Sequence, residues 1–177
     1  MTRVEPPLAG GESEAIIGAL ERERALFAWK CGGLDAAGLN TRLAPSAMTI
    51  GGLIKHVACV EDTHFARLWL AEPPPQPWVD VNWDADPNWE WNSAVNDSPE
   101  EIMAQWETSS ARSRAIVQAA LANGGLEQLG AYRTKTGESP NLRRILLDLI
   151  EEYARHLGQA DLIRESIDGL TGEDPPE

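Results

Sequence analysis

The sequence predicts an all-α protein, an antiparallel bundle of four helices. Apolar residues recur every three or four positions over the ranges 13–31, 49–71, 98–122 and 141–167, which is the period of an amphipathic helix. Residues that commonly cap helices stand near the ends of these ranges, and no segment has a clear strand pattern. Because each helix must bury its apolar face against another element, these observations predict a helical bundle.

Length and composition fit one globular domain. The chain has 177 residues, of which 42% are hydrophobic and 24% charged, and this is enough to build one core. We expect the bundle to span residues 13–170. Residues 1–12 carry prolines and glycines and predict a flexible N-terminal tail, whereas residues 171–177 predict an acidic C-terminal tail.

The net charge restricts the class of partner. A formal charge of −13 and a pI near 4.6 argue against nucleic acid or an anionic membrane surface, because both would repel the chain. No apolar run approaches a membrane span, and the first residues lack the apolar stretch of a signal peptide. We therefore expect a cytoplasmic protein that acts on a small molecule. Cys31 and Cys59 are interpreted as reduced, buried thiols.

The first two long helices have recognisable ends. Ser13 is a candidate N-cap for the first, and two glycines at 32–33 stop it. A short helical turn is expected over 35–42. Thr49 is a candidate N-cap for the second long helix, which the proline run 73–75 follows.

The segment 73–96 has no period and carries four tryptophans among prolines, aspartates and asparagines. We interpret it as a long ordered loop between the second and third helices, which packs over the mouth of a site or covers the bundle or a dimer contact.

The last two helices also have start and stop signals. Asp97 or Ser98, followed by Pro99 and two glutamates, is typical of a helix start. The third helix is expected to run to about Ala122, where the asparagine and two glycines at 123–125 stop it. An irregular connection with a short extended piece around 131–134 then leads to the fourth helix, which begins near Pro140 and ends at Gly169.

Two histidines stand where a bundle could bring them together. Asp148, Glu152 and His156 are four residues apart and form one stripe of a helix, while His56 lies on the apolar stripe of the second helix. A divalent cation would pair such groups if they were buried. The competing interpretations are a solvated Glu152–His156 pair and a core histidine with one hydrogen bond.

His56, Glu152 and His156 together match a catalytic metal site with three protein ligands and an open position. A carboxylate-bridged pair of metals is a further reading, prompted by the Glu-x-x-His spacing of Glu61 and His64. It is rejected because the second Glu-x-x-His that such a site needs is missing.

Three segments resemble the DinB-like superfamily, in its actinobacterial branch. They are residues 53–65 (LIKHVACVEDTHF), 80–89 (DVNWDADPNW) and 150–169 (IEEYARHLGQADLIRESIDG), and the resemblance covers roughly residues 13–170. It implies a DinB/YfiT-like four-helix bundle, commonly a homodimer. It also implies a divalent metal held by one histidine of the second helix and by two residues four apart on the last helix.

Matched to this chain, the implied ligands are His56, Glu152 and His156, with glutamate where much of the superfamily has histidine. Zinc is the first candidate metal, and nickel, manganese and iron are compatible with the same donors. Histidine often stands at the positions of Asp148 and Gln159 in this branch. Asp148 is kept as a candidate group that orients a ligand or acts as a catalytic base.

The resemblance implies a function as well as a fold. Relatives include thiol S-transferases that use mycothiol or bacillithiol, and metal-dependent isomerases and hydrolases. We therefore expect a metal-dependent thiol S-transferase that acts on small electrophiles. The alternatives are a metal-dependent hydrolase and a dimeric module that binds a metal or ligand without catalysis.

Overall fold

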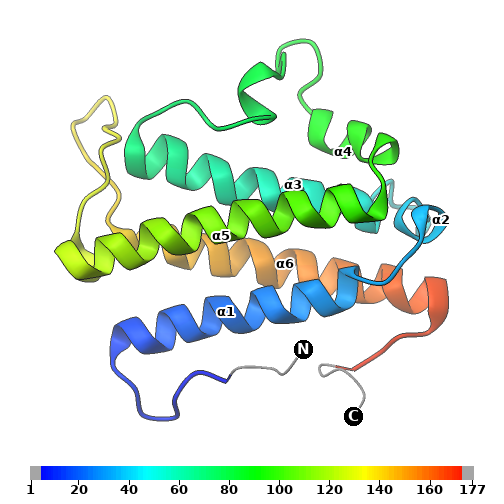
Figure 1. Ribbon diagram of the computed structural model, residues 1–177, viewed down its shortest axis with the longest axis horizontal. Coiled ribbons are helices and arrows are strands. Elements are labelled where there is room, and N and C mark those ends of the chain that lie inside the picture. Colours follow the sequence, from blue (N-terminus) through cyan, green and yellow to red (C-terminus); the bar gives the residue numbers. More distant parts are fainter. Residues whose placement is uncertain (1–4, 173–177) are drawn as a thin grey trace.

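The computed structural model describes residues 5–172, and these are mainly helical. The chain forms α1 (Glu12–Cys31), α2 (Ala36–Leu39), α3 (Ile50–Thr63), α4 (Trp89–Ser93), α5 (Pro99–Asn123) and α6 (Leu142–Asp168), which Figure 1 labels. A π-helical stretch, His64–Leu70, continues α3. Short 3-10 helices cover Trp78–Asp80, Ala94–Asn96 and Gly125–Glu127. Within residues 5–172 there is no strand, only an isolated bridge between Leu129 and Asn141.

Side-chain caps fix the starts of three long helices. Thr49 Oγ1 accepts a hydrogen bond from Gly52 N–H, and Asn141 Oδ1 accepts one from Arg144 N–H. Ser98 and Glu101 form a reciprocal capping box at the start of α5. The prediction that Ser13 caps the first helix is wrong. The N-cap is Gly11, two residues before Ser13, and α1 begins at Glu12, because the Glu14 carboxylate accepts the Gly11 N–H at 2.8 Å.

The four long helices lie side by side (Figure 1), with α1 against α6 and α3 against both α5 and α6. Contacts between matching ends show that α1 and α6 run in the same direction, since Arg143 pairs with Glu12 and Arg164 donates to the Lys30 carbonyl. α3 and α5 are also parallel. The expected antiparallel order therefore holds across α1 and α5 and across α3 and α6. It does not hold for α1 and α6 or for α3 and α5, which are parallel. The long connection between α3 and α5 brings the chain back to the end of the bundle at which α3 begins, so α5 starts there as well.

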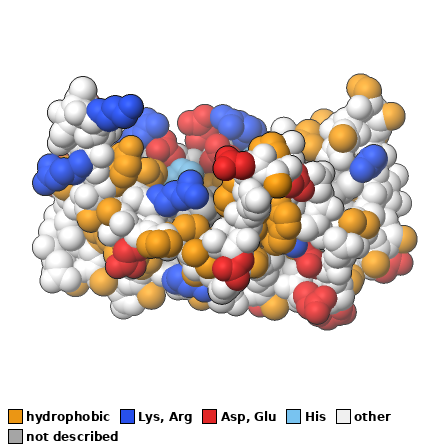
Figure 2. Space-filling model, turned by 90° about the horizontal axis from the view of Figure 1, so that it is seen from above, with side chains coloured by type: hydrophobic (Ala, Val, Ile, Leu, Met, Phe, Trp, Pro, Cys, Tyr) orange, Lys and Arg blue, Asp and Glu red, His pale blue; other side chains and the backbone are white. Residues whose placement is uncertain are grey.

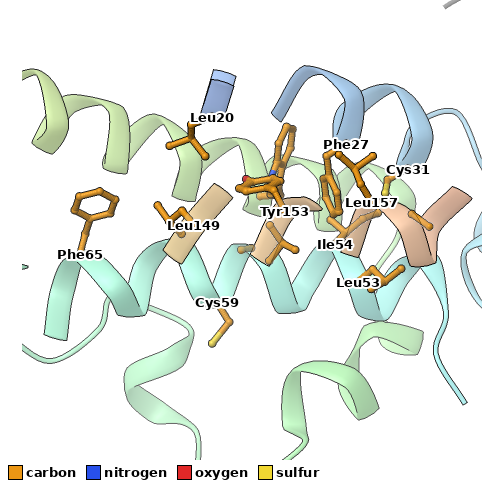
Figure 3. Close-up of a cluster of buried hydrophobic side chains, with 14 of the residues drawn as sticks. Leu20, Phe27, Cys31, Leu53, Ile54, Cys59, Phe65, Leu149, Tyr153 and Leu157 are labelled. Carbon is orange, nitrogen blue, oxygen red and sulfur yellow. The ribbon is translucent and has the colours of Figure 1, made fainter. Parts of the chain in front are cut away.

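The core between these helices is apolar with one polar network. Figure 3 shows Phe27, Ile54, Tyr153 and Leu157 converging from three helices, and all four side chains are buried. The Phe27 and Tyr153 rings meet edge to face, 5.5 Å between centroids. The Tyr153 hydroxyl donates to Glu61, whose carboxylate also accepts from Arg24.

Residues 73–96, the tryptophan-rich segment, are more helical than the sequence predicts. It contains a 3-10 helix, α4 and a second 3-10 helix, and it lies over the face of α3 that points away from the core. These helices are three to five residues long, so their periodicity cannot be recognised in a sequence. Figure 2 looks down on the molecule from this side and shows acidic, basic and apolar side chains interspersed.

The piece around 131–134, which was expected to be extended, is not a strand, but its backbone is hydrogen-bonded to the end of the π-helical stretch. Ala131 N–H donates to the Trp69 carbonyl at 2.7 Å, and Tyr132 N–H donates to the Leu68 carbonyl. None of the helices formed by residues 5–172 is long and apolar enough to cross a membrane.

Candidate metal centre

α3 and α6 bring the three predicted ligands together. α3 and α6 pack antiparallel, and His56, near the middle of α3, faces Glu152 and His156, near the middle of α6. His156 Nε2 lies 3.2 Å from Glu152 Oε2, and His56 Nε2 lies 3.8 Å from the same oxygen. One ligand atom from each side chain falls within 4.8 Å of the others.

The spacing of these atoms is compatible with one divalent cation, and the widest separation, up to 4.8 Å, would shorten when the ion binds. Ligands about 2.0–2.2 Å from a tetrahedral zinc ion are roughly 3.3–3.6 Å from one another, and the two distances to Glu152 Oε2, 3.2 and 3.8 Å, lie on either side of that interval. Two imidazole nitrogens and one carboxylate oxygen are the donors of many catalytic zinc sites. The residues present therefore suit a metal that keeps an open coordination position.

Neighbouring side chains orient the two ligands on α6. His156 Nδ1 lies 2.7 Å from Gln159 Oε1, and because an amide oxygen can only accept, Nδ1 carries a proton. In the neutral ring Nε2 then keeps its lone pair and faces Glu152 Oε2 at 3.2 Å, an arrangement that a cation bound to both atoms would stabilise. Arg155 donates to Glu152 Oε1 at 3.2 Å. That contact occupies one carboxylate oxygen and leaves Oε2 facing the histidines. Gln159 is thus a hydrogen-bond partner of a candidate ligand.

His56 touches two residues of α4 that the sequence did not identify. Its Nδ1 lies 3.3 Å from Glu90 Oε1, and its ring stacks on Trp91 with 4.6 Å between centroids. Both residues belong to the tryptophan-rich segment, for which the sequence predicted packing either over the mouth of a site or over the bundle or a dimer contact. No spacing rule linked them to His56, because the contact joins positions 34 residues apart.

Burial affects the protonation of His156. Desolvation lowers the pKa of His156 below its ordinary value and the nearby His56 adds to this effect, while Gln159 and Glu152 oppose it. His156 is therefore mainly neutral at pH 7, which is the form that can bind a metal.

Asp148 does not join the cluster. Its two carboxylate oxygens accept from Arg144, at 2.9 Å each. Eight residues of α-helix turn the chain by about 80° beyond two full turns and advance it by about 12 Å, so Asp148 points away from the direction of His156. Among residues 5–172, the structure gives Asp148 no contact with His56 or His156, and the interpretation as a base has no geometric support.

The residues of the rejected two-metal reading also lie outside the cluster. Glu61 is fully buried and pairs with Arg24 at 2.8 Å. His64 Nδ1 lies 2.9 Å from the carbonyl oxygen of Val60 on its own helix. Neither side chain contacts His56, Glu152 or His156 in the described part of the chain.

Both cysteines are buried thiols, as predicted. Burial raises the pKa of Cys59 to about 12, with further contributions from Glu90 and Asp62. Burial also raises the pKa of Cys31 far above its ordinary value. Figure 3 shows Cys59 directed away from the core, on the opposite side of α3. Neither residue is a thiolate at neutral pH, so neither is suited to act as a nucleophile.

A hollow of about 550 Å³ lies next to Trp91, and none of the three candidate ligands lines it. Trp91 forms one wall, and it is the same ring that stacks on His56. The other walls combine apolar side chains with amide groups and one cation, from Asn40, Arg42, Met48, Thr49, Asn88, Asn92 and Val95. The mixture is typical of a small-molecule site, and the size is within the usual range.

Comparison with protein families identifies the family of this chain. Residues 15–169 match the family model described as Mycothiol-S-transferase. No curated protein matches the chain significantly.

Proposed function

The chain belongs to the mycothiol-S-transferase family, and we propose that it is a metal-dependent thiol S-transferase that acts on small electrophiles. This membership agrees with the resemblance of the sequence to the DinB-like superfamily. The thiol we propose as cosubstrate is mycothiol.

One observation carries this proposal: His56, Glu152 and His156 converge, with ligand atoms within 4.8 Å of one another. A divalent cation held by these side chains would lower the pKa of a thiol at the open position, so that more of it is thiolate at neutral pH. Zinc is our first candidate.

The chain's own residues prepare this site. Gln159 and Arg155 hold His156 and Glu152 in the orientation that directs Nε2 and Oε2 toward His56. In the proposed reaction, the sulfur of the cosubstrate bonds to the electrophilic carbon and the thiol proton passes to solvent. The leaving group departs with the electron pair of the bond that breaks. No cysteine of the protein takes part.

We propose that the hollow beside Trp91 holds the polar part of the cosubstrate. Arg42 lines it, is exposed and, among residues 5–172, has no carboxylate at ion-pair distance. We expect Arg42→Ala to raise KM several-fold and leave kcat and the metal content unchanged. Steady-state kinetics and elemental analysis measure these quantities. A fall in kcat with no change in KM would contradict this assignment.

The central experiment is metal analysis of tag-free protein, followed by transfer assays with mycothiol and a generic electrophile. We expect about one zinc, nickel, manganese or iron ion per chain. His156→Ala should lose the ion and the activity, because it removes one of three ligands. His64→Ala is the matched control, since His64 lies outside the cluster, and it should keep both.

Two results would count against the proposal. Equal metal content in the His156→Ala variant and the native protein would show that the cluster is not the metal site. Metal binding without transfer from mycothiol, bacillithiol or glutathione would refute the transferase and leave a hydrolase or a binding module. We also propose a homodimer, which light scattering during gel filtration tests directly.

A further inference from the structure

The most unusual side chain near the cluster is Glu90, a buried carboxylate on α4. We propose that Glu90 is a positioning residue: it holds the proton of His56 on Nδ1 and thereby directs the lone pair of Nε2 toward Glu152 and His156. The metal-binding consequence rests on the proposed function, whereas the protonation of the His56 ring does not.

The contacts of the two ring nitrogens of His56 differ. Nδ1 lies 3.3 Å from Glu90 Oε1, which is within hydrogen-bond distance, and Nε2 lies 3.8 Å from Glu152 Oε2, which is beyond it. A neutral imidazole has one proton to donate. If Nε2 carried it, the lone pair of Nδ1 would face the Glu90 carboxylate without a proton between them. The contacts therefore favour the proton on Nδ1.

The burial of Glu90 supports a link to a cation. The residue is 8% exposed, and its second oxygen, Oε2, is buried without a hydrogen-bond partner among residues 5–172. A buried carboxylate is costly unless positive charge compensates it. As metal ligands, two neutral imidazoles and the Glu152 carboxylate would carry a charge of −1, so a divalent cation would leave +1, which Glu90 would balance.

Glu90 is also held in place independently of His56. On one side of it, Trp89 packs over Lys55, whose Nζ lies 4.5 Å from the ring centroid. On the other side, Trp91 lies over Gly52. Lys55 additionally pairs with Asp97, at 2.6 Å, where the segment joins α5. The fold of the segment thus presents the carboxylate to His56.

Further back in the same segment, Trp78 is completely buried, and its Nε1–H donates to Asp62 at 2.8 Å. Asp62 also accepts from Ser109 on α5. The tryptophan-rich segment is therefore fixed to the outer face of α3 at both ends of the stretch that carries Glu90. A positioning role requires such an arrangement. The Glu90 carboxylate can orient the His56 imidazole only if the carboxylate itself stays fixed.

Two substitutions separate the parts of this role. Glu90→Leu removes both the acceptor and the charge, while Glu90→Gln keeps an oxygen acceptor and removes only the charge. Glu165→Gln, at an exposed site on α6, is the control for a change of net charge. Nitrogen-15 NMR of the imidazoles in metal-free protein reports which nitrogen carries the proton, and His56→Ala identifies the His56 signals among three histidines. Competition with a chelator gives the affinity for zinc.

We expect the native protein and Glu90→Gln to carry the proton on Nδ1, and Glu90→Leu to shift it to Nε2. Zinc affinity should fall by roughly 10-fold to 100-fold in Glu90→Leu, the usual effect of losing a group that orients a ligand, and by less in Glu90→Gln. Glu165→Gln should match the native protein.

An unchanged tautomer in Glu90→Leu would overturn the proposal. If that variant does not fold, Glu90→Gln, which has the same shape, still tests the effect of the charge, and native affinity in it would overturn the charge argument. If the native protein binds no metal, the proposed function fails, but the NMR experiment still decides whether Glu90 sets the His56 tautomer.

Discussion

At the scale of single residues, Glu152 contacts three neighbours at once. Its Oε2 faces His156 and His56, and its Oε1 accepts from Arg155. Replacement by glutamine keeps the shape but removes the only negative charge among the three candidate ligands. We expect Glu152→Gln to weaken zinc binding by at least about 10-fold, since even groups that only orient a ligand contribute that much. Equilibrium dialysis against a chelator measures the change.

Asp148→Asn provides the matched comparison on the same helix. It also replaces a carboxylate by an amide, but Asp148 pairs with Arg144 and does not reach the cluster. Its zinc affinity should equal that of the native protein. A loss as large as that of Glu152→Gln would show that the acidic stripe acts as a whole, as the spacing in the sequence first suggested.

The two cysteines test the identity of the nucleophile. Because burial raises the pKa of Cys59 to about 12 and that of Cys31 further, neither provides thiolate at neutral pH. We expect Cys59→Ser and Cys31→Ser to retain the transferase activity of the metal-loaded protein. Initial rates per folded protein measure it. Activity that disappears with Cys59 alone would indicate a hidden protein nucleophile one helical turn from His56.

At the scale of elements, α3 packs against its neighbours with two faces. One face carries core residues such as Leu53 and Ile54, and the other meets the tryptophan-rich segment. Gly52 lies on the second face, where a Cβ would come 2.8 Å from Trp91 Cε3. Gly52→Ala must therefore displace the Trp91 ring, and we expect a loss of about 1–3 kcal/mol in the free energy of unfolding, typical of overpacking, together with weaker zinc binding.

Gly158→Ala is the control for this prediction, because Gly158 lies inside α6 and nothing lies within 4 Å of the position of its Cβ. There, alanine should stabilise the protein by about 0.5–1 kcal/mol through helix propensity. Urea denaturation and tryptophan fluorescence compare the two variants. Equal stability in both would mean that Trp91 is not held tightly against α3.

The elements also show what the sequence could predict. The four long helices lie within one or two residues of the predicted ranges, if the π-helical stretch is counted with α3, because their ends depend on local caps such as Thr49, Ser98 and Gly169. The helices of the tryptophan-rich segment could not be predicted. They are too short to show a period, and contacts with distant residues such as Lys55 and Asp62 hold them.

The residues of the candidate site also fall into those that the sequence could predict and those that it could not. His56 was recognised because it interrupts an apolar stripe, and Glu152 and His156 because they are four residues apart on one helix. Asp148 shares that spacing, but eight residues of helix carry it out of reach of His156. Glu90 and Trp91 have no spacing rule at all, because only the folding of α4 onto α3 brings them to His56.

At the scale of the whole molecule, a buried polar network joins all four long helices. Glu61 on α3 pairs with Arg24 on α1 and accepts from the Tyr153 hydroxyl on α6. That hydroxyl accepts in turn from Trp106 Nε1–H on α5, at 2.8 Å. Glu61→Ala should cost about 3–5 kcal/mol in the free energy of unfolding, because it breaks a buried ion pair and leaves Arg24 with Glu21 as its remaining carboxylate partner. Chemical denaturation measures this, and a cost below about 1 kcal/mol would mean that water replaces the carboxylate.

The same network predicts how stability depends on alkaline pH. Burial, followed by the charge of Glu61, raises the pKa of Tyr153 well above its ordinary value of 10.0, and burial raises the pKa of both cysteines above 9.0. Above these ordinary values the unfolded chain releases protons that the folded protein keeps. The folded state then binds more protons, so its stability falls as pH rises. Each group contributes a slope of at most about 1.4 kcal/mol per pH unit.

Two tyrosine variants separate the contribution of the Tyr153 hydroxyl proton from those of the cysteines. Tyr153→Phe should lower stability at pH 8 by about 1–3 kcal/mol, because Glu61 and Trp106 lose a buried partner. It should also make the decline between pH 10 and 11 shallower by up to about 1.4 kcal/mol per pH unit, since no proton remains there to be released. Tyr132→Phe changes the other tyrosine, which is 40% exposed, and should leave the decline as it is. Urea denaturation of both variants at several pH values measures the slopes. Equal slopes in the two variants would mean that Tyr153 ionises as readily in the folded protein as in the unfolded chain, and the network would then not exclude the charged phenolate.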